Sequence, residues 1–484
     1  MQPALYYFIL PVIVYLFVAV HLRLWKRRYS IRKIRGPPRP SFLLGHEYLL
    51  ASRQYVGDLE MEWYQQYGAV YRTGRCFGGS DHQRQLKILG PAFAISQLRL
   101  FLNVFQGCAL KLTEKINEYV REGKEINVLQ WTSKVALDII GITAFRYEFN
   151  ALNDEQSELM AALTNIFGEA QMLPKKWELL FMALWRILPE QVLSLLERLP
   201  NRVSVRLKRF KDVATKISRP IFEKQLIEVA NDPDPSEKDI VNVLAMSYLA
   251  DDVKKRMSDQ EIDSQLATFV LAGYDTIVGA IAWLLYELSR HPEVQMKAPG
   301  ALAWDDYDAM SWLNAAIKEV LRCHPVASGL LREASKDEVL PLAERIITSD
   351  GEPCSEIPIS KGQVIFASVY TYNRLPSVWG DDAAEWNLCR FLEDREMKQE
   401  YLGTYANLMT FSGGVRGCLG WRFAVMAVQS VVTELLSNFE FSVPQGAPEL
   451  HHGPAGAALI PIVPGKENEG PQVPLRVTPL NKEV

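Results

Sequence analysis

One long helical pattern limits the folds open to this chain of 484 residues. The pattern spans residues 259–290 and stops before Pro292, because proline cannot continue a helix. Its centre, residues 267–285, is apolar except for a short segment that contains Gly273, Asp275 and Thr276. A membrane span would place Asp275 near mid-bilayer at about 2.5–3.5 kcal/mol. We therefore expect a helix buried in a protein core, whose polar segment marks a functional site.

The rest of the sequence predicts a mainly α protein with small β-sheets. Helical patterns fill residues 97–300, and proline- and glycine-rich segments with short β-like runs fill residues 325–415. The composition, 48% hydrophobic and 23% charged, excludes wholesale disorder. A formal net charge of −4 argues against a nucleic-acid partner. The six cysteines include no C-x-x-C pair, which argues against a disulfide framework or a zinc ribbon and favours a reducing compartment.

The N-terminus predicts a membrane anchor. Residues 4–20 are uncharged and mostly apolar, at the short end of the length that a spanning helix needs. Arginine and lysine follow this run, which favours a retained anchor over residues 1–22 with the body on the cytoplasmic side. Residues 23–40 form a basic and proline-rich linker, and residues 41–484 form the remaining domain.

The sharpest local motif surrounds a cysteine. Residues 411–420 read F-S-G-G-V-R-G-C-L-G and precede a helical pattern over residues 421–436. Glycine lets the backbone approach a flat ligand closely, and N–H groups near a helix start stabilise a thiolate at Cys418. A thiolate of this kind is what a haem iron needs for O–O cleavage. Taken alone, the motif also fits a structural cysteine.

With its full spacing, this stretch closely resembles the signature F-x-x-G-x-R-x-C-x-G of the cytochrome P450 family, the haem-thiolate monooxygenases. Its fixed positions are filled by Phe411, Gly414, Arg416, Cys418 and Gly420. The resemblance implies the cytochrome P450 fold, preceded by a single N-terminal transmembrane helix. It also implies a haem b cofactor, with Cys418 as the axial ligand of the iron and Arg416 at a propionate.

A second motif resembles the family's E-x-x-R. It consists of Glu319 and Arg322, which share one helix face. In the family this pair holds the arginine of a later P-x-R-F/W element. Arg390 fills that position here, although Leu388 replaces the usual proline. The resemblance implies that these three residues support the haem pocket structurally.

A third motif, Ala272-Gly273-Tyr274-Asp275-Thr276, resembles the family's A-G-x-D/E-T. By resemblance Asp275 relays protons and Thr276 holds water or dioxygen, so these two are the predicted catalytic residues. Arg332 lies where the family places another propionate arginine, and His82 lies in a region that contacts haem. The runs at residues 372–380 and 421–424 look especially like fungal members.

Two stretches depart from the family. Only Ser80 separates the start of the small N-terminal sheet from the segment that holds His82, so the roof of the pocket is missing. Leu86 occupies the position of the arginine in the pattern W/H-x-x-x-R. A second shortened region lies between Val294 and Asp305, where residues 298–300 interrupt a helical pattern. These departures suggest a shortened chain that binds haem weakly and lacks a complete substrate pocket.

The resemblance implies a monooxygenase that inserts one oxygen atom from O2 into an apolar small molecule by hydroxylation or epoxidation. A fungal secondary metabolite such as a terpenoid, or a xenobiotic, is the expected substrate. The chain has no G-x-G-x-x-G motif. NADPH and flavins therefore act only through a partner, NADPH–cytochrome P450 reductase, with cytochrome b5 as a further candidate.

The expected location is the endoplasmic reticulum membrane, where the single-pass protein contacts membrane lipid and its catalytic domain faces the cytoplasm. Two alternatives stay open. One is a catalytically impaired, shortened haem protein, for which Leu86 and the missing roof are the evidence. The other is an O2-independent haem isomerase or dehydratase, which the intact Asp275 and Thr276 disfavour.

Overall fold

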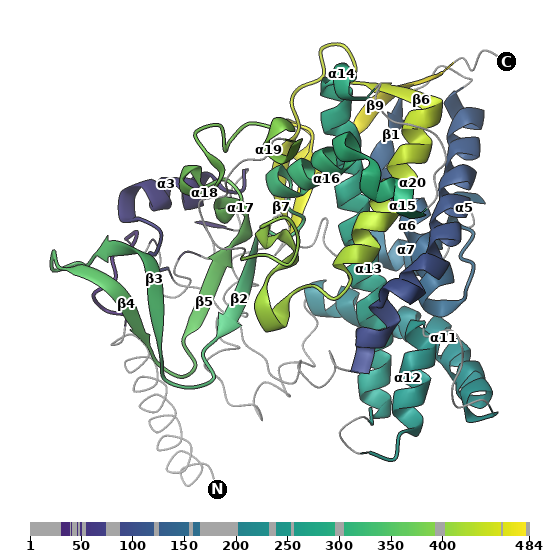
Figure 1. Cartoon of the computed structure of the whole chain (residues 1–484), viewed down its shortest axis with the longest axis horizontal. Helices are drawn as coiled ribbons and strands as arrows, with labels where there is room; N and C mark the ends of the chain where they lie inside the picture. The colour runs from purple at the N-terminus through teal and green to yellow at the C-terminus, as the bar shows by residue number, and fades with distance from the viewer. Residues whose placement is uncertain are drawn as a thin grey trace, which may run out of the picture. The chain divides into compact units, whose positions relative to one another are not determined.

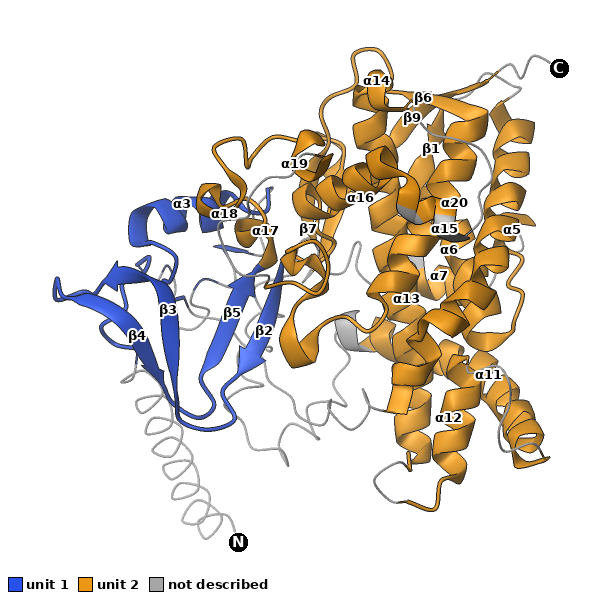
Figure 2. Cartoon of the chain, viewed as in Figure 1, with its two compact units in different colours: residues 1–80, 173–201, 329–368 blue, residues 81–172, 202–328, 369–484 orange. Residues whose placement is uncertain are grey.

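The computed structural model describes residues 31–38, 40, 46, 49–50, 55–73, 88–120, 125–153, 158–164, 202–231, 239–252, 256–295, 304–392, 402–455 and 458–480. The predicted anchor over residues 1–22 lies outside these residues, as do most of the linker, His82, Leu86 and residues 298–300. The chain divides into two compact units, coloured separately in Figure 2. The first unit comprises residues 1–80, 173–201 and 329–368, and the second comprises residues 81–172, 202–328 and 369–484.

The first unit contains a helix and two antiparallel strand pairs. The helix α3 spans Asp58–Tyr67. Strand β2 (Gly329–Glu333) pairs with β5 (Val364–Ser368), and β3 (Glu338–Ile347) pairs with β4 (Pro353–Ile359). Figure 1 shows the two pairs as neighbouring ribbons. A small cluster of buried isoleucines forms the core of this unit: Ile34, Ile346, Ile357 and Ile359.

The second unit is mainly helical and holds the large core of the protein. Its longer helices are α5 (Ile95–Val120), α6 (Val128–Phe145), α7 (Glu158–Thr164), α11 (Arg202–Asn231), α12 (Ile240–Leu249), α13 (Asp259–Arg290), α16 (Ser311–Cys323) and α20 (Trp421–Asn438). Short α-helical segments are α14 (Pro292–Gln295), α15 (Trp304–Ala309), α17 (Val369–Tyr372), α18 (Pro376–Trp379) and α19 (Cys389–Leu392). Short 3-10 segments are η1 (Gly90–Phe93), η2 (Ala151–Asn153), η3 (Met409–Phe411), η4 (Gly414–Arg416) and η5 (Glu467–Glu469).

Small antiparallel sheets complete the second unit. One sheet has the strand order β1-β9-β6, with β1 at Ile126–Asn127, β9 at Pro474–Pro479 and β6 at Phe439–Ser442. The other pairs β7 (His451–Ala455) with β8 (Ala458–Ile462). The prediction of a mainly α fold with small β-sheets is thus confirmed for the residues described.

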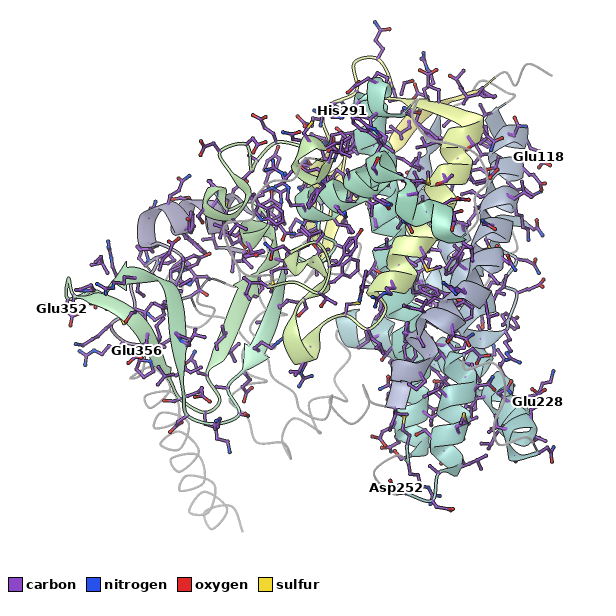
Figure 3. All side chains as sticks on the ribbon, in the orientation of Figure 1. Glu118, Glu228, Asp252, His291, Glu352 and Glu356 are labelled. Atoms are coloured by element: carbon purple, nitrogen blue, oxygen red, sulfur yellow. The ribbon has the colours of Figure 1, made fainter. Side chains whose placement is uncertain are left out.

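The helix α13 has the boundaries that the sequence predicts. It begins with a capping box, because Ser258 accepts from the backbone of Glu261 and the Glu261 side chain accepts from the backbone of Ser258. It ends at Arg290, and Pro292 opens the next helix. His291, labelled in Figure 3, follows its last residue.

The helix α13 is a core helix. In the part of the chain that the structure describes, it is the one helix long and apolar enough to cross a membrane. It packs against α6, α11, α16 and α20 (Figure 1), and residues 277–289 are all buried. The core interpretation is therefore confirmed over the membrane alternative.

A hydrogen-bonded cluster joins α13 to α16 and β7. His324, the residue after α16, places Nε2 2.7 Å from Glu287 Oε1 and Nδ1 2.8 Å from His452 Nε2. Because a carboxylate only accepts, His324 donates from Nε2 and accepts at Nδ1 the hydrogen bond that His452 donates. The indole of Trp283 stacks on His324 with ring centroids 4.1 Å apart. Burial lowers the pKa of both imidazoles, which favours this neutral form.

We predict that acid destabilises the protein through this Glu287–His324–His452 cluster. Burial lowers the pKa of His324 below its ordinary 6.5 and holds the pKa of His452 well below that value. Below about pH 6.5 the unfolded chain therefore binds protons that the folded chain does not, so stability is present above this pH and falls as the pH drops. We expect a loss of up to about 1.4 kcal/mol per pH unit for each histidine.

Denaturant unfolding between about pH 7 and about pH 5 measures this slope. The matched variant is His324→Phe, which keeps a ring against Trp283 but cannot titrate. Its slope should be shallower than that of the wild type. Equal slopes in the two proteins would contradict the assignment.

Candidate functional site

The polar segment of α13 directly precedes the continuously buried part of the helix, residues 277–289. Ala272 and Thr276 are exposed one turn apart, and Thr276 Oγ1 donates to Ala272 O at 2.7 Å. A side chain at Gly273 would collide with Ile140 of α6, so glycine permits the close approach of the two helices. This arrangement leaves the Thr276 oxygen able to accept a further hydrogen bond.

Asp275 carries the unusual carboxylate of this segment. It is half-buried, and its Oδ2 is a buried atom without a hydrogen-bond partner among the residues that the structure describes. Burial raises the pKa of Asp275 to about 7. Because this value is close to neutrality, the carboxyl group can both take up and release a proton at physiological pH.

The cysteine loop, residues 411–420, is folded tightly on itself. The backbone N–H of Cys418 donates to Phe411 O at 2.7 Å, which closes the loop. Gly414 has a φ of +61°, a conformation that favours glycine. A Cβ at Gly417 would lie 2.5 Å from Thr404 Oγ1, so this position also requires glycine. The glycine pattern in the sequence thus reflects backbone geometry that holds the cysteine in place.

Cys418 presents a free thiol two residues before Gly420, the N-cap of α20. The residue is exposed, yet the surrounding atoms desolvate the thiol enough to raise its pKa, and the backbone of Gly420 acts in the opposite direction. Two other thiols, Cys108 and Cys323, are buried and have pKa values raised to about 12, which makes them inert. Among these three, Cys418 is the accessible candidate ligand.

Aromatic packing links the cysteine loop to α13. A Cβ at Gly420 would lie 3.4 Å from the Phe93 ring, and the centroid of that ring lies 6.0 Å from the centroid of Phe269. Phe269 is one turn before Gly273, and α20 packs against α13. The thiol-bearing loop and the polar segment of α13 therefore belong to one neighbourhood of the second unit.

The structure brings Glu319, Arg322 and Arg390 together in the core. Glu319 and Arg322 have no exposed side-chain surface. Their contact is bidentate, with Arg322 Nε 2.8 Å from Oε2 and Nη2 2.7 Å from Oε1. Arg390 Nε lies 3.4 Å from the same Oε1. We call these three residues the ionic cluster.

The remaining donors of the ionic cluster are satisfied by backbone and by a second carboxylate. Arg322 donates to the carbonyls of Asn373, Ala383 and Glu385. Arg390 donates to Trp379 O, and its Nη1 lies 3.0 Å from Asp382 Oδ1. With Asp382 included, two positive charges face two negative charges, which a buried ion pair requires.

The other predicted residues are distributed as follows. Phe411, Gly414, Arg416 and Gly420 lie on the cysteine loop, and Arg416 forms no ion pair with any residue described in the structure. Arg332 lies in β2 of the first unit, is exposed, and donates to Leu331 O. Sequence reasoning missed the buried Asn373, which contacts both the ionic cluster and Met409, two residues before the cysteine loop.

Comparison with known proteins places the chain in a family. The sequence model described as Cytochrome P450 matches residues 44–466. Cytochrome P450 monooxygenase 91 of Postia placenta is 31% identical over 386 residues, which cover 75% of this chain and 71% of that protein. A ganoderic acid synthetase of Ganoderma lucidum is 31% identical over 396 residues, which cover 75% of this chain and 72% of that protein.

A mainly helical fold with an accessible thiol on a glycine-rich loop is typical of a haem-thiolate enzyme. The matches show that the chain belongs to the cytochrome P450 family, and its fungal relatives make it a monooxygenase of the oxidoreductase class. The family implies a haem cofactor.

One longer alignment bears on the length of the chain. Cytochrome P450 monooxygenase 81 of Postia placenta is 28% identical over 521 aligned positions, which cover 94% of each protein. These 521 positions exceed the 484 residues of this chain by 37, so at least 37 of them carry no residue of this chain. The relative therefore contains internal segments that this chain lacks.

We predict that the variant Glu319→Gln destabilises the protein strongly. It leaves two buried guanidinium groups facing one remaining carboxylate, and loss of one partner from a buried ion pair typically costs about 3–5 kcal/mol. The measurement is the free energy of unfolding in denaturant.

The matched control is Glu449→Gln. Glu449 pairs with Arg290 at 2.8 Å but is 70% exposed, so its loss should cost less than about 1 kcal/mol. If both variants lose the same free energy of unfolding, the ionic cluster stabilises the protein no more than an exposed ion pair does, which would contradict the prediction.

Proposed function

We propose that this chain is a haem-thiolate monooxygenase that inserts one oxygen atom from O2 into an apolar small molecule, by hydroxylation or epoxidation. The proposal rests above all on one observation. The accessible thiol of Cys418 and the unpartnered carboxylate of Asp275 lie on two segments that Phe93 connects. A ligand for iron and a group that exchanges protons are both needed for oxygen activation.

The residues present fit a haem. Cys418 supplies the soft anionic ligand that iron binds in this class of enzyme. Arg416, two residues before it and unpaired among the residues described, is available to a propionate. Phe411, Gly414 and Gly420 complete the loop around the thiol. By resemblance Arg332 and His82 contribute further contacts to haem b.

When bound, the haem would supply the iron chemistry of O2 activation, with electrons that a redox partner delivers. The chain's own residues exchange protons and hydrogen-bond water. Asp275 exchanges a proton at Oδ2, because its pKa of about 7 keeps both forms populated. Thr276 donates to Ala272 O and so offers its oxygen to the proton of a bound water. The ionic cluster supports the loop without contacting the reacting atoms.

The apolar substrate is proposed from the family resemblance, in which residues 325–331 and 454–459 correspond to segments that usually line the substrate pocket. Leu459 N donates to Val326 O at 2.8 Å, which joins two segments that line the pocket in the family. Val326 also packs near Gly279 of α13. A terpenoid or another fungal secondary metabolite, or a xenobiotic, is the proposed substrate class.

The proposal includes the surroundings of the enzyme. Electrons come from NADPH through the flavins of NADPH–cytochrome P450 reductase, with cytochrome b5 as a further candidate. Residues 1–22 anchor the protein in the endoplasmic reticulum membrane, and the catalytic domain faces the cytoplasm.

A second candidate is a shortened haem protein with impaired catalysis. It is favoured by the aligned positions that monooxygenase 81 of Postia placenta has and this chain lacks. Leu86, in place of the family's arginine, points in the same direction. This candidate predicts that haem binds weakly and that no product forms.

We predict that Asp275→Asn lowers product formation by about 10²-fold or more, because it removes the group that exchanges a proton. The same change should raise stability above neutral pH by roughly 1–3 kcal/mol, since burial raises the folded-state pKa of this carboxyl and so disfavours its charged form. The assay combines the enzyme with a reductase and a panel of apolar compounds, and mass spectrometry detects the addition of one oxygen atom.

The matched control is Asp263→Asn on the same helix, where the carboxylate pairs with Arg219 at 3.1 Å. It should keep wild-type product formation. Turnover without O2 and NADPH would instead indicate an isomerase or dehydratase. Haem binding without any product would favour the shortened, impaired form.

A further inference from the structure

Asn373 occupies a buried position between the ionic cluster and the cysteine loop. It follows α17 directly and has no exposed surface. Its backbone carbonyl accepts a hydrogen bond from Arg322 Nη1 at 2.8 Å. The residue therefore contacts the ionic cluster on one side through its backbone.

The side chain of Asn373 contacts α16 and residues 409–410. Its Oδ1 accepts from the backbone N–H of Met409 at 3.2 Å. Its Nδ2 donates to Thr410 Oγ1 at 2.9 Å and lies 3.4 Å from Leu321 O. These partners fix the orientation of the amide, because a backbone N–H needs an acceptor and a carbonyl needs a donor.

Thr410 completes the connection. Its hydroxyl accepts from Asn373 and donates to Leu321 O at 2.6 Å, in the last turn of α16. Both residues therefore attach the segment just before the cysteine loop to the helix that carries Glu319 and Arg322. Every polar atom of this buried amide is used, so no apolar residue can replace it without leaving partners unsatisfied.

Backbone hydrogen bonds connect the residues after Thr410 to Cys418 and to Thr404. Phe411 O accepts from the backbone N–H of Cys418 at 2.7 Å. Ser412 O accepts from both the backbone N–H and the hydroxyl of Thr404, each at 3.1 Å. A displacement of residues 409–410 would therefore displace the backbone that holds the thiol.

We propose that Asn373 is a positioning residue for Cys418. Asn373 couples the ionic cluster to the cysteine loop, which carries Cys418 as the haem ligand. This proposal rests on the proposed function, since it assumes that Cys418 ligates the iron. Asn373 touches neither the haem ligand nor the reacting atoms directly. Its effect on ligation comes from the backbone at Met409 and Thr410.

The test compares Asn373→Ala with the control Asn387→Ala in the holoenzyme. Asn387 borders the ionic cluster on another side, where its backbone N–H donates to Glu319 Oε1 at 2.8 Å and its side chain donates to Asp382. It makes no hydrogen bond to the cysteine loop among those the structure describes. The readout is the Soret band of the reduced, carbon-monoxide-bound protein, together with the free energy of unfolding.

We expect Asn373→Ala to lose the thiolate-type band at least tenfold faster than the wild type, whereas Asn387→Ala keeps it. Unfolding free energies separate a ligation effect from simple loss of stability. If Asn373→Ala is destabilised but retains the band as long as the wild type does, Asn373 is only structural and the proposal fails. A wild-type protein without any thiolate-type band would instead refute the proposed function.

If Asn373→Ala yields no holoenzyme, a second variant tests the proposal. Thr410→Val removes the hydroxyl that connects Asn373 to Leu321 at almost unchanged volume, and should also shorten the lifetime of the band. Its control is Thr143→Val, which removes a buried hydroxyl-to-carbonyl hydrogen bond of 2.6 Å inside α6. Equal band lifetimes in these two variants would overturn the proposal.

Discussion

The ionic cluster is the interaction on which the rest of the second unit depends. Two guanidinium groups and the carboxylate of Glu319 are withdrawn from water, while the second carboxylate, Asp382, is partly exposed. Such buried groups stabilise a fold only when each charge is paired and each donor is used. Arg322 meets this condition by donating to carbonyls of two segments, at Asn373 and at Ala383 and Glu385. Segments far apart in the chain are thereby fixed around one buried point.

The ionic cluster and the helix α13 are connected to the cysteine loop through two different sets of contacts. On one side, Asn373 and Thr410 attach the cysteine loop to the end of α16. On the other side, Phe93 and Phe269 connect Gly420 to the polar segment of α13. The loop is thus fixed by polar contacts behind the thiol and by aromatic packing beside it. This division suits a site where the thiol must stay in place while Asp275 exchanges protons.

The parts of the fold and site that the sequence predicts are those with local signals. The boundaries of α13 follow from Ser258, Glu261 and Pro292, which act within one turn of each end. The cysteine loop follows from its glycines, whose spacing reflects contacts within ten residues. Glu319 and Arg322 are three residues apart, so a helix alone brings them together.

The parts that the sequence did not predict depend on partners distant in the chain. Asn373 joins Leu321 to Met409, and nothing next to Asn373 in the sequence indicates either partner. The hydrogen bond between His324 and His452 likewise spans 128 positions. Such contacts arise from tertiary packing and leave no periodic pattern to read.

The proposed site depends on Cys418 as the thiolate ligand of a haem iron, and the carbon-monoxide-bound spectrum of the reduced protein tests this ligation. The measurement compares the wild type with Cys418→Ser and with Cys389→Ser, since Cys389 is also an exposed, free cysteine. We expect a thiolate-type Soret band in the wild type and in Cys389→Ser, and its loss in Cys418→Ser. Retention of the band in Cys418→Ser, or a haem-loaded wild type without the band, would contradict this expectation.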